Sequence, residues 1–345
     1  MNKLAKSLYE NSSKYLIILF LILASFNLIA QDSDESEYIE SVTIIGSKED
    51  VKDLAGSGAV ISNEDLQKAM DTDIQKILTA VPGIYMRTEE GYGLRPNISI
   101  RGTAIERSGK VTIMEDGVLV APAPYTASSA YYFPTTGRIH AVEVLKGPAV
   151  VSQGPQTIGG AINLISTPIP KVASGKFIQE IGENGMTRTH TYYGASQGNF
   201  GALVEIHEHA SDGYDSIANV GGDTGFDKSD LMIKANYTSG NHSLTFKRVD
   251  LDETSNQSYV GLSQASFNAN PRMRYGATAY DKMMNDGEQT SLTYEGSFNN
   301  FDVRFTSWQN DYHRDWFKVS DFNNDSEHGE SCLLYTSPSP RDVCS

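Results

Sequence analysis

Two patterns of apolar and polar residues divide the chain near Pro170. Beyond it, long stretches alternate between apolar and polar side chains; in residues 301–306, phenylalanine and valine alternate with aspartate, arginine and threonine. Such alternation is the period of a strand whose two faces meet different surroundings. About seven strands of roughly ten residues are predicted in residues 169–330, joined alternately by tight turns and longer polar loops.

Short turns at one end of the strands, long loops at the other and aromatic strand ends are typical of an outer-membrane β-barrel. A soluble β-sandwich is the alternative that the same alternation allows. The strand length, the absence of cysteines from this region and the N-terminal leader described below favour the barrel.

Residues 51–168 have the mixed pattern of a compact α+β domain. Two helices are predicted from capping signals, Ser62 with Asp65 and Thr72 with Gln75, each ahead of apolar residues. A Pro-Gly pair then ends the second helix.

Strands follow these helices. In residues 97–101, two isoleucines are predicted on a buried face, and the asparagine, serine and arginine that alternate with them on a wet face. Asp116 and Gly117, between two apolar runs, predict a two-residue hairpin. Two further strands are predicted on either side of a Gly-Pro break. Gly159 and Gly160, at the start of the last strand, indicate a close approach of backbone.

The N-terminus has the order of a secretory signal peptide: lysines, an apolar run and a small residue, Ala30. An uncleaved anchor helix is the alternative, although the run is shorter than the roughly 20 residues that span a bilayer. Residues 31–40 carry five carboxylates, so residues 31–50 are predicted to be a flexible arm. The β-branched residues 41–45 can add as a strand to a partner's sheet edge, or form the first strand of the next domain.

Composition narrows the possible partners. The formal net charge is −15, and loss of residues 1–30, which hold three lysines and one glutamate, makes it −17. This balance argues against a nucleic-acid partner, because phosphate binding needs a basic surface. Both cysteines lie in residues 331–345, a segment that breaks the strand pattern and resembles a translated sequencing adapter. We interpret it as a non-native tail and expect a larger barrel than residues 169–330 can form.

Several segments resemble the TonB-dependent outer-membrane receptors, and within them the ferric citrate receptor branch. The segments are LRPNISIRGT (94–103), MEDGVLVAPAPY (114–125), VEVLKGPAVVSQGPQTIGGAINLIST (142–167) and SNQSYVGLSQASFNANP (255–271). The first three resemble the plug domain, and the fourth an extracellular-loop segment. ESVTIIG (40–46) is similar to the TonB box. The resemblance implies an α+β plug folded inside an antiparallel transmembrane barrel of about 22 strands.

The resemblance also implies roles for single residues. The TonB box comprises Glu40, Ser41, Val42, Thr43, Ile44 and Ile45. Structural positions of the plug are Arg101, Gly102, Asp116, Gly117, Gly147, Gly159 and Gly160. Candidates for contact with an anionic chelate are Arg95, Arg107, Tyr125, Arg272 and Arg274. The first two arginines are expected to be exposed, whereas Arg101 is expected to bond to the barrel wall. Solvated loop positions are the alternative for Arg272 and Arg274.

The implied function is TonB-dependent import of a ferric chelate such as ferric citrate. A receptor for another siderophore or a vitamin, and a passive structural or adhesion barrel, are the alternatives. Expected partners are TonB with its inner-membrane energising complex, the chelate and outer-membrane lipid. No set of catalytic residues stands out, so we predict no enzyme, no cofactor and no resident metal, with iron entering only as chelated cargo. His207 and His209 share one side of a strand without further ligands, which predicts a solvated position in a lumen or loop.

Overall fold

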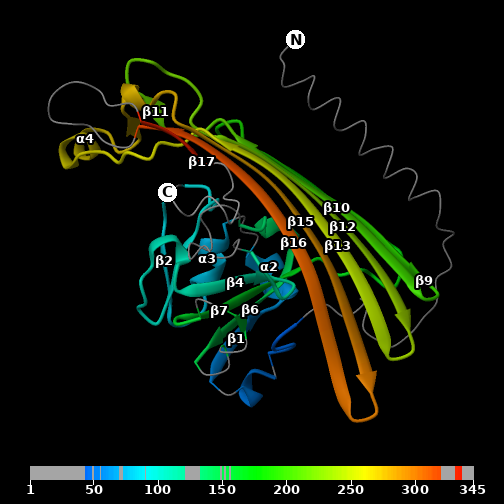
Figure 1. The fold of residues 1–345 in the computed structure, drawn as a ribbon. Coiled ribbons are helices and arrows are strands. Elements are labelled where there is room, and N and C mark those ends of the chain that lie inside the picture. Colours follow the sequence, from blue (N-terminus) through cyan, green and yellow to red (C-terminus); the bar gives the residue numbers. More distant parts are fainter. Residues whose placement is uncertain are drawn as a thin grey trace.

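The computed structural model describes residues 43–48, 50–54, 56–69, 73–89, 91–120, 133–147, 150, 153–154 and 157–319, and the backbone of 331–335. Figure 1 shows a compact mixed domain beside a long curved sheet, which passes along one side of it like part of a wall. No helix in the described residues is long and apolar enough to cross a membrane.

The compact domain, which we call the plug, is built on a five-stranded sheet. In spatial order its strands are β1 (Ser57–Ile61), β6 (Ile139–Lys146), β7 (Gly160–Ser166), β4 (Val111–Glu115) and β5 (Val118–Leu119). A separate antiparallel pair is formed by β2 (Ile84–Arg87) and β3 (Asn97–Ile100). The helices are α2 (Asn63–Ala69) and α3 (Ile74–Leu78), with 3-10 turns η1 (Asp50–Asp53), η2 (Glu106–Ser108) and η3 (Thr136–Arg138). Together these elements enclose an apolar core.

The predicted capping signals are found with one change. Ser62 and Asp65 form the reciprocal contacts of a capping box before α2, including a 2.7 Å bond from Ser62 Oγ to Asp65 Oδ2. Asp73 caps α3, because its Oδ1 accepts from the backbone N–H of Gln75 at 2.8 Å. The predicted cap at Thr72 is therefore wrong by one residue; Asp73 directly precedes the first helical residue and fits the preference for aspartate at this position.

The glycine-containing turns hold the plug strands in register. Asp116 and Gly117 both have positive φ, 49° and 75°, so the β4–β5 connection is the predicted two-residue hairpin. A Cβ at Gly160 would lie 2.5 Å from the carbonyl oxygen of Leu145 on β6. A Cβ at Gly159 would likewise lie 2.9 Å from the carbonyl oxygen of Lys110. The glycine pair thus allows the tight strand packing that its position predicted.

Strand β3 does not have the predicted wet face. Asn97 and Ser99 are 1% and 2% exposed, as buried as the isoleucines between them. The strand lies inside the plug with its polar side chains satisfied locally, since Asn97 Oδ1 accepts from the Arg107 backbone N–H and Ser99 Oγ donates to the carbonyl of Thr103. Arg101 follows in the left-handed region, is exposed, and donates to Ser57 Oγ of the plug rather than to the wall.

The curved sheet contains the seven predicted strands, all antiparallel. They are β8 (Ser174–Ile181), β9 (Thr187–Gln197), β10 (Phe200–Ser211), β12 (Phe226–Ser239), β13 (His242–Ser255), β15 (Lys282–Phe298) and β16 (Phe301–Lys318). At 8 to 18 residues, most exceed the predicted ten. The backbone of β17 (Ser331–Tyr335), in the segment interpreted as a non-native tail, pairs with β16.

The two ends of the sheet differ as predicted. Two-residue turns at 198–199, 240–241 and 299–300 define one end, which we call the turn end. Long connections at 212–225 and 256–281 define the other, the loop end. These loops contain α4 (Gln264–Ala269) and a short parallel pair of β11 (Ser216–Ile217) with β14 (Met273–Arg274).

The two faces of the sheet have opposite chemistry. Large apolar side chains are exposed on the side away from the plug, among them Tyr237, Phe246, Leu292 and Phe305. The residues that alternate with them are buried and mostly polar, such as Lys234, Lys247, Gln289 and Asn285. Apolar-out and polar-in alternation is the pattern of a transmembrane barrel wall around a polar interior.

Candidate ligand and partner sites

The plug is joined to the sheet by six buried charged side chains. The plug supplies Glu115, Asp116 and Arg138, and the sheet supplies Asp230, Lys234 and Lys247. Arg138 donates to both oxygens of Glu115 and, through Nε at 3.2 Å, to Asp230. Lys247 Nζ lies 2.5 Å from Glu115 Oε1 and 2.7 Å from Asp116 Oδ2. Three cations face three carboxylates, so the charges of this cluster balance.

The cations keep the plug carboxylates ionised. Burial alone would raise the pKa of Glu115, but Arg138 and Lys247 outweigh it and lower that pKa to about 2. Burial also opposes ionisation of Asp116, and Lys234 and Lys247 hold its pKa well below the ordinary range. Both carboxylates are therefore ionised at neutral pH, which preserves their ion pairs with Lys234 and Lys247 of the sheet.

A pocket of about 200 Å³ opens at the loop end, between the plug and the two long loops. Tyr92 of the plug lies in its wall, with its ring 5.5 Å from that of Tyr214 and 4.7 Å from that of Phe226. Burial, with a contribution from Tyr214, raises the pKa of Tyr92 to about 12, so its hydroxyl stays protonated. Glu89 and Asp215 add carboxylates to the lining. The pocket therefore offers hydroxyl and carboxylate oxygens beside aromatic surface.

The plug arginines near this pocket are already paired. Arg95 is 7% exposed rather than open to solvent as expected, and it donates to Glu253 of β13 at 3.1 Å and to Gln257 at 2.9 Å. Arg107 is half-buried and lies 2.8 Å from Glu89. Arg95 thus ties the plug to the wall, the role that the sequence had suggested for Arg101.

The two loop arginines differ from each other. Arg274 is buried, and its guanidinium donates to the backbone carbonyls of Asn256 and Thr278, which fixes the loop around it. Arg272 is exposed above the ring of Tyr214, 5.9 Å from its centroid; in the described part of the chain it forms no ion pair, although it interacts electrostatically with Asp215 of the pocket. Among the described candidates, Arg272 is the cation available to an anionic ligand. Tyr125 lies outside the described residues.

The predicted histidine pair lies at the plug–wall contact. His207 is 2% exposed, and neither of its ring nitrogens has a hydrogen-bond partner among the described residues. A Cβ at Gly137 of the plug would lie 2.3 Å from its Nε2, so the ring packs directly on the plug backbone. The prediction of a solvated position is therefore wrong for His207. His190 and His209 are nearby, but the described residues contain no group of three or more candidate ligands placed to hold a metal ion.

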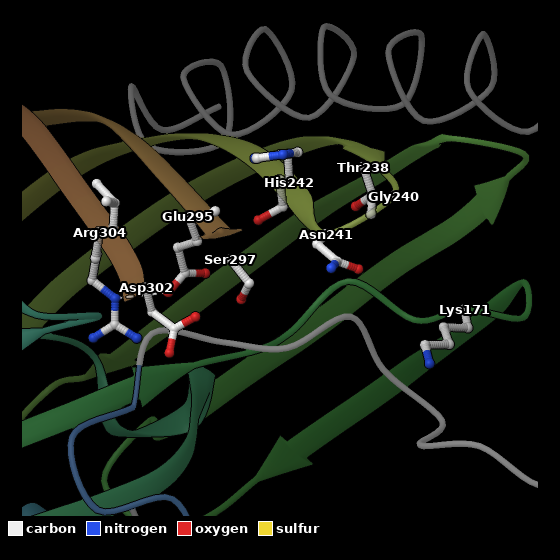
Figure 2. A pocket seen from close by; sticks show the side chains of 12 residues that line it. Lys171, Thr238, Gly240, Asn241, His242, Glu295, Ser297, Asp302 and Arg304 are labelled. Atoms are coloured by element: carbon white, nitrogen blue, oxygen red, sulfur yellow. Dashed lines mark hydrogen bonds and ion pairs between the residues drawn. The ribbon is translucent and has the colours of Figure 1, made fainter. Parts of the chain in front are cut away.

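A larger pocket, of about 950 Å³, lies at the turn end. Figure 2 shows Glu295, Asp302 and Arg304 grouped where β15 turns into β16, with Lys171 on the segment that leads into β8. Arg304 Nε donates to Glu295 at 2.7 Å, and its Nη1 donates to the backbone carbonyl of Thr43 at 3.2 Å. The turn end thus contacts the segment that resembles the TonB box.

The described part of this box is in contact with the plug. The side chain of Ile45 is 8% exposed and packs in a cluster with Met114 and Leu145. The backbone N–H groups of Ile44, Ile45 and Gly46 all donate to the carboxylate of Glu143, at 2.8 to 2.9 Å. Glu40 to Val42, and the rest of the predicted arm before them, lie outside the described residues.

Sequence reasoning missed the residues that make these contacts. Glu143 sits in an apolar strand and is 1% exposed, so an isolated carboxylate in an apolar run was the available signal. Lys234 and Lys247 were visible only as the polar half of an alternating pattern. The carboxylate partners of Lys247 are 132 and 131 positions away in the sequence, and no local signal connects such distant residues.

Comparison with known proteins identifies the plug. Residues 50–161 match the family model described as the TonB-dependent receptor plug domain. The chain carries a TonB-dependent receptor plug. The iron-regulated outer membrane virulence protein of Vibrio cholerae is 30% identical over 151 residues, which is 42% of this chain and 22% of that protein. The vitamin B12 transporter BtuB of Photobacterium profundum is 22% identical over 332 residues, 86% of this chain and 52% of that protein.

Solved structures give the same fold. The ferric citrate transporter FecA, unliganded, matches with a TM-score of 0.68 at 21% identity, over 82% of this chain and 44% of that one. The ferric yersiniabactin uptake receptor FyuA of Yersinia pestis matches with a TM-score of 0.65 at 19% identity, over 77% and 42%. The chain therefore spans about half or less of the relatives it matches. Its fold is a plug followed by the first strands of an antiparallel receptor barrel, and its location is the outer membrane of a Gram-negative bacterium.

Proposed function

We propose that the chain takes part in TonB-dependent import of an iron chelate, with ferric citrate as the first cargo to test. One observation carries the proposal: the loop-end pocket and the box segment lie at opposite ends of the same plug. A ligand at the pocket and a partner at the box segment could then each shift the conformational equilibrium of the same plug. The apolar outer face of the sheet would meet outer-membrane lipid.

The choice of an iron chelate is supported by the relatives and by local charge. The matched structures include a ferric citrate transporter and a ferric yersiniabactin receptor. Arg272 offers an exposed guanidinium at the pocket edge, which suits a ligand that carries carboxylates. A vitamin cargo is the second candidate, because the vitamin B12 transporter aligns with 86% of this chain.

Deletion of the box tests the energy coupling. In the receptor expressed from its complete gene, removal of residues 40–45 should abolish uptake of radioactive ferric citrate while binding to whole cells is retained. Uptake should also stop in a host that lacks TonB. Unchanged uptake in both cases would leave a passive barrel as the better description.

Arginine substitutions test the cargo site. Arg272→Ala should weaken ferric citrate binding about tenfold, the factor for one charge-assisted hydrogen bond in a solvated place. The control is Arg248→Ala, which removes a partly exposed arginine that pairs with Asp250 and Glu288 on the sheet. Competition by cyanocobalamin, with no effect of ferric citrate, would favour the vitamin reading.

A further inference from the structure

The segment at residues 44–46 wraps around one carboxylate. Ile45 and Gly46 donate their backbone N–H groups to Glu143 Oε1, at 2.8 and 2.9 Å, and Ile44 donates to Oε2 at 2.9 Å. Gly46 has a φ of 92°, in the left-handed region that favours glycine. Successive N–H groups that converge in this way form an anion-binding nest. Glu143 is thus held by backbone dipoles from the box segment.

This bent form cannot pair with a sheet edge. In an extended strand, successive backbone N–H groups point to opposite sides, and only alternate residues bond to one neighbour. Here three consecutive N–H groups point to a single side chain, and none of the described residues 43–46 is in a strand. Strand addition to a partner therefore requires these N–H groups to leave Glu143 first.

Glu143 has few other partners for its charge. Its side chain is 1% exposed, and no cation pairs with it in the described part of the chain. Within the described residues, the one further hydrogen bond to its carboxylate comes from Asn163, whose Nδ2 donates to Oε2 at 2.9 Å. A buried carboxylate is costly unless donors satisfy it, so the plug gains by keeping the segment in place.

The segment is also bound to the wall. Arg304, on β16, donates to the carbonyl of Thr43 at 3.2 Å and is itself oriented by Glu295 (Figure 2). The two ties belong to different bodies, since Glu143 is on plug strand β6 and Arg304 is on the sheet. A shift of the plug along the wall would change the distance between them.

We propose that Glu143 is the positioning residue that holds the second half of the box in a closed, non-strand form, with Arg304 as a weaker second tie. This rests on the proposed function, because it assumes that residues 40–46 bind TonB. The hydrogen bonds continue from Glu143 to Asn163, and from Asn163 Oδ1 to the N–H of Gly117, beside the buried charge cluster. The closed form is thereby connected to the contacts that fix the plug in the wall.

The test is Glu143→Gln, which keeps the shape and replaces one acceptor oxygen by an N–H₂ donor. When the amide oxygen of the glutamine accepts from Ile45 and Gly46, the amide NH₂ group faces the N–H donors of Ile44 and Asn163. Two of the four hydrogen bonds to this side chain are then lost. With Thr43→Cys as a probe in the detergent-solubilised receptor, maleimide labelling should become on the order of tenfold faster, the factor for one to two hydrogen bonds. Binding of the purified periplasmic domain of TonB should strengthen to a similar extent, with ferric citrate affinity unchanged.

The controls distinguish the proposed hold of Glu143 on the box segment from the proposed TonB-dependent import. Glu288→Gln changes an exposed carboxylate on the sheet and should leave labelling unchanged. Gly46→Ala should open the nest, because the φ of 92° at this position is strained for alanine, and it leaves the buried charge of Glu143 unchanged. It should speed labelling as Glu143→Gln does, and it replaces Glu143→Gln in the test should the latter fold poorly. Equal labelling in all variants would overturn the proposal. Faster labelling without any TonB binding would support the role of Glu143 in holding the box segment and count against the proposed function.

Discussion

Removal of Arg138 is the sharpest test of how the plug is held. Its side chain is 1% exposed and satisfies Glu115 of the plug and Asp230 of the wall, whose side chains are both fully buried. In Arg138→Met, Glu115 keeps Lys247 as a partner, 2.5 Å away. Asp230 keeps only the hydroxyl of Thr135 among its hydrogen-bond donors in the described residues. The variant therefore leaves one buried carboxylate without a cation.

Loss of one partner from a buried ion pair costs about 3–5 kcal/mol. Hydrogen exchange read by mass spectrometry can measure this in the detergent-solubilised receptor, because the amides of β4 and β7 exchange when the plug opens locally. At about 1.4 kcal/mol per tenfold, exchange of these strands should become roughly 10²- to 4 × 10³-fold faster. Amides in the middle of β12 and β13 should change far less, since their ladders do not depend on Arg138.

Two further variants decide the interpretation. Arg138→Met with Asp230→Asn removes both charges and should recover most of the protection. Arg248→Met, at an ion pair that is about one-third exposed, should change exchange by less than about fivefold, because such pairs contribute about 0–1 kcal/mol. If Arg138→Met exchanges like Arg248→Met, the charge cluster does not hold the plug and the reasoning fails.

Three other changes probe the same contact. Gly137→Ala should speed exchange in the plug, since a Cβ there would lie 2.3 Å from Nε2 of His207, and adding His207→Ala should restore protection. Acidification should loosen the plug, because the pKa of Glu115 is lowered from 4.5 to about 2 in the folded protein. The stabilisation from the ionised Glu115 is therefore present above pH 4.5 and is lost as the pH falls towards 2. Pepsin cleavage of the plug can follow this loss, and cleavage that stays constant with pH would contradict it. Gly160→Ala would place a Cβ 2.5 Å from a backbone oxygen of β6 at a φ of 155° and should reduce the folded yield. Gly198→Ala, at a φ of 59° but in open space, carries backbone strain without that clash and should reduce the yield less.

The fold was predictable where the signal is local or periodic. The capping box at Ser62, the hairpin at Asp116 and the alternation in β12 to β16 each depend on residues close in sequence. The prediction for the polar residues of β3 was wrong because alternation of apolar and polar residues shows that the two faces of a strand differ. It does not show that the polar face is exposed to solvent. Asn97 and Ser99 are buried in the plug and are satisfied by loops up to ten positions away.

The candidate sites were less predictable because they depend on long-range pairing. The sequence suggested exposed ligand contacts at Arg95 and Arg107, but partners 158 and 18 positions away take up their charges. The TonB box stays a prediction from resemblance, and the backbone N–H groups of its described part bond to Glu143, about 100 positions later. Charge pattern alone shows which residues need partners and does not show which distant residue supplies them.

The polarity of the plug–wall contact suggests how a plug can be both fixed and movable. In the described residues, the main apolar core contains only Leu251 and Tyr312 from the sheet, while charged and polar groups make most of the remaining ties. Apolar burial is lost in full when two surfaces separate, whereas each polar tie can be exchanged for bonds to water at a net cost of about 0.5–1.5 kcal/mol. Sliding the plug along this wall would therefore break ties one at a time while its own core stays intact. The buried cluster around Arg138 is the exception, because its charges need each other, and it is where a pulling force on the box segment should meet most resistance.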